Sequence, residues 1–118
     1  MNRYQVRNCS AWHYPFYQGC EGLIDAQTGE LYEYDRNYTL DVLVSYSSMV
    51  AFYDRAIDTL YLLPRYDYSI TTRQHLRKWC EDVIGVPVYK DDIERGNKCG
   101  TAIVKCSAWV FLGREYRY

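Results

Sequence analysis

The sequence predicts an α+β fold: a mainly antiparallel β-sheet, built from two hairpins and a C-terminal strand, with one principal helix at about 72–84 packed on one face. Three observations predict it. Alternating apolar and polar residues fill the segments before residue 64, one amphipathic stripe follows, and β-branched and aromatic residues dominate the last long segment. Because no repeat or linker divides the chain, residues 1–118 are expected to form a single domain.

The first hairpin is expected at residues 23–32. Its apolar segments flank a turn that begins at Asp25 and ends at Gly29. Glycine has no Cβ, so Gly29 can adopt the positive φ that such a turn requires at little cost.

The second hairpin begins with a strand at 40–46, because period-2 alternation places four apolar side chains on one face: Leu40, Val42, Val44 and Tyr46. A bulge or tight bend is expected at Ser47 and Ser48, after which the strand continues over 49–53. A polar turn at 54–58 then leads to the returning strand at 59–63.

The helix prediction depends on a single apolar stripe with the spacing of an α-helix: Leu76, Trp79, Cys80, Val83 and Ile84. Thr71 and Gln74 fit a capping box, in which the threonine hydroxyl accepts the Gln74 amide. Gly85 occupies the position of a left-handed residue after the helix, and Pro87 prevents its continuation.

Three short predictions follow for the remainder of the chain. Residues 86–90 are a strand candidate, and residues 91–95 are expected to form one helical turn before Gly96. Residues 101–112 are rich in β-branched and aromatic side chains, so they are expected to form a long strand. The terminal segment 113–118 is expected either to fray or to insert into a groove of a partner.

The overall charge does not favour a protein that binds nucleic acid without regard to sequence. The chain of 118 residues has a formal net charge of −1, which gives no general attraction to phosphate. The N-terminal residues lack the apolar region of a signal peptide, and no apolar run reaches the length of a membrane helix. A cytoplasmic protein is therefore expected, with no membrane partner.

The sequence favours neither a metal site nor a catalytic site. Zinc could be held by a set drawn from Cys9, His13, Cys20, Cys99 and Cys106, but the spacing contains no close ligand pair and favours buried thiols, so no cofactor is expected. The hydroxyls of Ser69–Thr72 precede a helix and are typical of caps rather than nucleophiles. Solvated turns and a helix N-terminus account for the two groups of carboxylates: Glu30, Glu33 and Asp35, and Asp91, Asp92 and Glu94. No catalytic residue is expected.

A more specific pattern lies in the segments 45–51 and 60–75, which read SYxxxVA and LYLLPRYDYSxTTxxH. This pattern resembles a small domain of unknown function that occurs in tailed phages, prophages and the bacteria that carry them. The resemblance covers about residues 19–79, and Ser48-Met49 stands where related sequences often carry Thr-Pro. It implies a phage or mobile-element origin, and it implies no activity and no catalytic residues.

The 14 tyrosines favour binding over catalysis, because a phenol stays protonated at neutral pH and suits contact surfaces. We therefore expect a small non-enzymatic phage accessory protein that binds a host macromolecule. Its most concrete form is an anti-CRISPR-type inhibitor that sterically blocks a nucleic-acid-processing defence complex in the host cytoplasm. The expected partner-binding residues lie around the start of the helix: Arg65, Tyr66, Tyr68, Arg73, His75 and Arg77.

Two alternatives stay open at this corner of the sequence. His75 lies at the edge of the apolar stripe, where a structural hydrogen bond to a strand end or loop is favoured over a ligand-contacting or pH-sensitive role. The same tyrosines and arginines could instead grip single-stranded nucleic acid, with Tyr66 and Tyr68 stacking on bases and Arg73 and Arg77 contacting phosphates. Both a monomer and a homodimer are compatible with the sequence.

Overall fold

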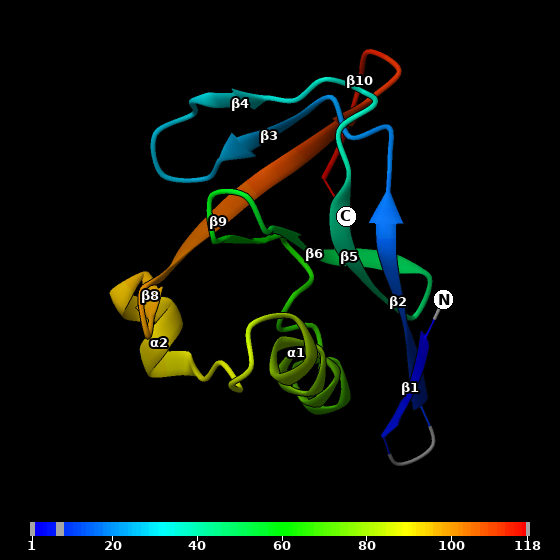
Figure 1. Ribbon diagram of the computed structural model, residues 1–118, viewed down its shortest axis with the longest axis vertical. Helices are drawn as coiled ribbons and strands as arrows, with labels where there is room; N and C mark the ends of the chain where they lie inside the picture. Colours follow the sequence, from blue (N-terminus) through cyan, green and yellow to red (C-terminus); the bar gives the residue numbers. More distant parts are fainter. Residues whose placement is uncertain (1, 7–8, 118) are drawn as a thin grey trace.

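The computed structural model describes residues 2–6 and 9–117, with side chains described from Tyr17 to Arg117. The described residues form ten strands and two helices (Figure 1). In chain order these are β1 (Asn2–Val6), β2 (Cys9–Tyr17), β3 (Gly22–Asp25), β4 (Leu31–Glu33), β5 (Leu40–Ser45), β6 (Ser48–Asp54), β7 (Thr59–Leu62), α1 (Ile70–Val83), α2 (Lys90–Arg95), β8 (Asn97–Lys98), β9 (Thr101–Phe111) and β10 (Arg114–Tyr116).

Eight strands follow one another in the sheet order β1-β2-β5-β6-β7-β9-β3-β4, while β8 and β10 both pair with β9. Among the described strands only the β7–β9 pair is parallel, with Thr59 opposite Ala102 and Leu62 opposite Lys105. The predicted α+β class, with a mainly antiparallel sheet and one principal helix, is confirmed.

The central strands bury side chains on both faces of the sheet because their residues alternate between two cores. Leu60 and Leu62 of β7 face α1, where they pack with Leu76 and Trp79. Tyr61, between them, faces the opposite core, which the β3–β4 hairpin and β10 cover. Figure 1 shows this arrangement, with α1 on one side of the central strands and the β3–β4 hairpin on the other. The long β9 strand connects the two parts, since it pairs with β7 along its first half and with β3 along its second.

The helix begins two residues earlier than predicted, and its cap is a different residue. Ser69 is extended (φ −150°, ψ 169°), and its hydroxyl accepts the Thr72 amide at 3.1 Å. The predicted cap at Thr71 is wrong because Thr71 already lies in the first helical turn. The C-terminal prediction is confirmed, since Gly85 follows the helix with φ +91°.

The first hairpin is confirmed as the β3–β4 pair, with Gly29 at φ +76°. The tight bend expected at Ser47 and Ser48 is confirmed, although the turn begins one residue earlier, at Tyr46. Tyr46 and Ser47 have φ values of +52° and +65° and form a two-residue turn that pairs Ser45 with Ser48. Tyr46 is therefore exposed in a turn instead of buried on a strand face. The bulge lies in β5–β6 itself, where the register shifts between Leu43 and Val44.

The largest differences from prediction lie at the two ends of the described chain. The strands β1, β2, β8 and β10 were not predicted, and the strand predicted at 86–90 is absent from the described structure. That segment instead leads into α2 and buries Val88. The segment predicted to fray folds back as β10, where Tyr116 stacks on Trp109 with ring centroids 4.8 Å apart. Tyr118 lies outside the described residues. The helical turn at 91–95 is confirmed as α2, which ends at Gly96 with φ +70°.

Candidate functional site

Five of the six predicted partner-binding residues line two separate hollows near the segment that joins β7 to α1, and the sixth, His75, is buried. Arg65 and Tyr68 line the first hollow, beside the β5–β6 turn. Tyr66, Arg73 and Arg77 line the second hollow, between α1 and α2. The sequence suggested one surface at this corner, whereas the structure has two hollows. Tyr68 lines the first hollow and Tyr66 lines the second.

The first hollow has a volume of about 360 Å³, and two tyrosine rings and one arginine are among its lining residues. Tyr68 is 64% exposed and Tyr46 is 47% exposed, and the two rings meet edge to face at 6.2 Å. The guanidinium carbon of Arg65 lies 5.3 Å from the centre of the Tyr68 ring, a cation–π distance. We call Tyr46, Arg65 and Tyr68 the aromatic patch.

His75 lies directly behind the aromatic patch and is fully buried. Its Nδ1 atom is 2.9 Å from the Ser45 hydroxyl, at the end of β5, and its ring is 6.3 Å from that of Tyr46. A second hydroxyl contact joins Ser45 to Thr72 at 3.3 Å. The histidine therefore ties the β5–β6 turn to α1 and positions Tyr46, but no surface of its own reaches solvent.

The second hollow has a volume of about 490 Å³ and a mixed lining. Its apolar and aromatic lining residues are Tyr66, Leu76, Val88, Tyr89 and Ile93, and its charged ones are Asp67, Arg73, Arg77 and Lys90. Arg77 lies with its guanidinium carbon 5.2 Å from the centre of the Tyr89 ring, and Lys98 Nζ lies 5.7 Å from the same centre.

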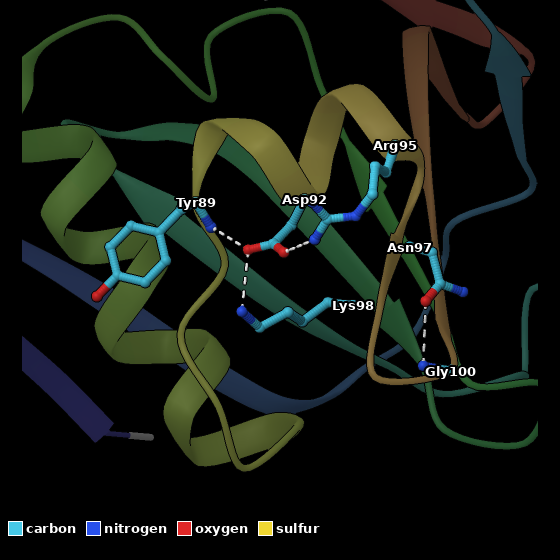
Figure 2. Close-up of polar contacts among 6 residues, drawn as sticks. All are labelled: Tyr89, Asp92, Arg95, Asn97, Lys98 and Gly100. Atoms are coloured by element: carbon cyan, nitrogen blue, oxygen red, sulfur yellow. Dashed lines mark hydrogen bonds and ion pairs between the residues drawn. The ribbon is translucent and has the colours of Figure 1, made fainter.

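The position of Tyr89 is set by Asp92 (Figure 2). The Asp92 carboxylate is buried, accepts the Tyr89 amide at 2.9 Å and the Lys98 ammonium at 3.1 Å, and also pairs with Arg95. Burial alone would raise the pKa of Asp92, but the Tyr89 amide and the two cations outweigh it and lower the pKa. The prediction that this acidic cluster favours the N-terminus of a short helix is confirmed, since Asp91 and Asp92 lie in the first turn of α2.

Four other tyrosines donate hydrogen bonds to carboxylates. Tyr34 and Tyr38 donate to the two oxygens of Asp54 at 2.7 and 2.6 Å, and Asp54 is buried. Tyr53 donates to Asp58 at 2.6 Å, and Tyr32 donates to Asp25 at 2.7 Å. A phenol that donates a hydrogen bond to a carboxylate loses its proton less readily. The hydrogen bond to Asp54 and burial therefore raise the pKa of Tyr38 to about 12. These phenols serve the fold, unlike those at the two hollows.

The part of the chain with described side chains contains no cluster of three or more potential metal ligands. Cys20 and Cys106 are buried, and burial raises the pKa of each thiol to about 12. Cys99 is exposed in the turn between β8 and β9, where Asn97 Oδ1 accepts the Gly100 amide at 3.2 Å (Figure 2). The side chains of Cys9 and His13 lie outside the described residues. Neither helix has the length and apolar character needed to cross a membrane, as judged on the described residues.

Sequence reasoning missed two rings that shape these hollows, Tyr46 and Tyr89. Alternation assigned Tyr46 to a strand face, and Tyr89 was placed in a strand that does not form. A signal was present for Tyr89, because the acidic residue three positions later matches a helix N-terminus that starts at Lys90. The i, i+4 spacing of Arg73 and Arg77 correctly indicated that they share a side of the helix.

Comparison with known proteins gives a family but no activity. No curated protein and no solved structure matches the chain. A family model matches residues 17–95, a segment that includes every residue lining both hollows but ends before β9. This match agrees with the resemblance to a domain of unknown function. Because it spans well over half of the chain, the protein belongs to a family of unknown function, DUF8033.

Proposed function

We propose that this protein is a small, non-enzymatic phage accessory protein that binds a host protein through the aromatic patch. The most concrete form of the proposal is a counter-defence inhibitor that sterically blocks a nucleic-acid-processing complex such as a CRISPR effector. The phage connection comes from the SYxxxVA … LYLLPRYDYSxTTxxH pattern, and the binding role comes from the patch itself.

The observation that carries the binding role is the exposure of Tyr46 and Tyr68 together, at 47% and 64%. Tyrosine and arginine are the residue types that most often contribute large shares of binding energy at interfaces. Each ring here is held from behind, because Tyr46 lies in a tight turn against His75 and Tyr68 is stacked by Arg65. A pre-positioned patch loses little conformational entropy on binding, so it can form a strong contact from few residues.

The test is affinity capture from a bacterial host lysate with three forms of the protein. The wild type is compared with Tyr46→Ala/Tyr68→Ala and with Ile57→Ala/Leu112→Ala, a matched control that removes two exposed apolar side chains elsewhere. We expect the wild type and the control to recover the same host protein and the patch variant to lose it. Recovery that is unchanged in the patch variant would count against the aromatic patch.

The inhibitory part has its own readout. Expression of the wild type should restore plating of a phage that the host's CRISPR system targets, and the patch variant should not. If capture succeeds but plating is unchanged, the binding role stands and the counter-defence role is rejected.

A second candidate function is contact with single-stranded nucleic acid through Tyr66, Tyr68, Arg73 and Arg77. The observation in its favour is that Arg73 and Arg77 line one hollow beside two tyrosine rings. Labelled oligonucleotides should then bind with an affinity that falls as salt rises, because bound phosphates release counterions. Absence of binding at low salt would remove this candidate.

A further inference from the structure

The second hollow concentrates positive charge on a chain that carries little net charge. Arg73, Arg77 and Lys90 line it, against the single carboxylate of Asp67, whereas the whole chain has a formal net charge of −1. Lys90 lies 4.0 Å from Glu94, an exposed pair that neutralises it weakly. Among the described residues, neither Arg73 nor Arg77 forms an ion pair. The hollow therefore attracts an anion.

Arg77 is already held in position for such an anion. Its guanidinium lies over the Tyr89 ring, and Lys98 approaches the same ring. The Tyr89 amide and the Lys98 ammonium both bond to the buried Asp92 (Figure 2), so this carboxylate anchors the Tyr89 backbone and the Lys98 side chain, while Arg77 and Lys98 contact the ring itself. A planar guanidinium fixed in this way can bind a phosphate through two parallel N–H···O bonds.

The rest of the lining is apolar and suits a flat ring more than a second charge. Tyr66 and Ile93 are half-buried and Tyr89 is exposed, so these three supply the apolar surface, whereas Leu76 and Val88 are 2% exposed and contribute almost none. The volume of about 490 Å³ lies within the range of roughly 300–1,000 Å³ in which small-molecule sites fall. A ligand that fills this space needs an anionic group at one end and an apolar, planar body at the other.

We infer that the second hollow is a binding site for a free nucleotide. Arg73, Arg77 and Lys90 contact the phosphate, and the base packs against Tyr66 and Ile93. An acidic peptide would satisfy the cations but would leave the apolar wall unused. A long single strand would need a groove beyond one nucleotide, whereas these cations converge on one hollow. The inference does not depend on the proposed protein-binding function, because the aromatic patch borders the other hollow.

The test is calorimetric titration of the purified full chain with the ribonucleoside 5′-monophosphates, with adenosine and with inorganic phosphate. We expect at least one monophosphate to bind with a Kd below about 1 mM, which corresponds to roughly 4 kcal/mol. It should bind at least about tenfold more tightly than adenosine or phosphate alone, because only the complete ligand uses both ends of the site. Amide chemical-shift changes should map to α1 and α2.

Variants and competing ligands make the result decisive. Arg73→Gln/Arg77→Gln should weaken binding by about tenfold or more, while Arg114→Gln, on β10, and Tyr46→Ala/Tyr68→Ala should leave it unchanged. The inference is overturned if no monophosphate binds, or if the paired arginine variant, still folded by circular dichroism, binds as the wild type does. It is also overturned if hexaglutamate or a ten-nucleotide single strand binds more tightly than every monophosphate and displaces it.

Discussion

Tyrosines in this protein divide by what their hydroxyl groups contact. Tyr34, Tyr38 and Tyr53 donate to the carboxylates of Asp54 and Asp58, inside or at the edge of the core. A buried carboxylate that accepts hydrogen bonds from two phenols is well stabilised, and replacing it leaves at least one buried hydroxyl without an acceptor. These three tyrosines therefore serve the fold through their hydroxyl groups.

Asp54→Asn should destabilise the fold by about 1–3 kcal/mol, because Tyr34 and Tyr38 donate to different carboxylate oxygens and one of these becomes an NH₂ group that faces a hydroxyl. Urea denaturation measures the loss. Asp35→Asn is the control, since Asp35 is exposed and accepts a local turn bond from the Asn37 amide at 2.8 Å. Equal stabilities for the two variants would show that the Asp54 network contributes nothing.

At the level of elements, the start of α1 is set by its cap. The cap is Ser69, whereas Thr71 lies inside the helix. Ser69→Ala should cost about 1 kcal/mol, because it leaves the Thr72 amide without its 3.1 Å acceptor. Thr71→Ala should change stability by less than about 0.5 kcal/mol, since alanine suits a helical turn. Thermal unfolding of both variants checks this, and a larger loss for Thr71→Ala would restore the cap predicted from sequence.

The β5–β6 turn uses residues that its backbone does not favour. Tyr46 and Ser47 both have positive φ, whereas such turns prefer Asn-Gly. Tyr46→Asn/Ser47→Gly should stabilise the fold by about 1 kcal/mol by relieving the left-handed strain. The same variant should weaken capture of the proposed host partner, because it removes one of the two rings of the aromatic patch. If this variant gains stability and still binds as the wild type does, Tyr46 does not contribute to binding.

Local elements could be predicted from the sequence, and non-local pairings could not. The stripe from Leu76 to Val83 and the flanking Gly85 define α1 without help from the rest of the chain. The parallel pairing of β7 with β9 depends on residues 43 positions apart, such as Thr59 and Ala102 (102 − 59). The site divides in the same way: the arginine pair follows from helical spacing, whereas the approach of Tyr46 to Tyr68 requires the folded turn.

For the whole molecule, the phenols predict a loss of stability at alkaline pH. The Asp54 hydrogen bond and burial raise the pKa of Tyr38 to about 12, and burial and the Asp58 bond do the same for Tyr53. The unfolded phenols ionise at their ordinary value of 10.0, so between these values ionisation favours the unfolded chain. The free energy of unfolding should therefore be highest below pH 10.0 and decline as the pH rises toward 12.

Urea unfolding across this pH range, followed together with tyrosinate absorbance, measures the decline. The buried thiols of Cys20 and Cys106 should act in the same direction, because burial raises their pKa from 9.0 to about 12. Tyr38→Phe/Tyr53→Phe should be less stable at neutral pH but should show a smaller decline. A stability that stays constant up to pH 11 would contradict the hydrogen bonds assigned to these phenols.

The position of β9 has a consequence for how the protein is made. β9 lies between β7 and β3 in the sheet, yet it is synthesised after both of them and after the segment 17–95 that defines the family. Leu23 therefore emerges from the ribosome long before its sheet partner Trp109 exists. The α1 side can assemble during translation. The apolar face of the β3–β4 hairpin stays uncovered until β9 has been synthesised. Translation rate and chaperone access over this interval should then govern the yield of folded protein more than the stability of the finished molecule does.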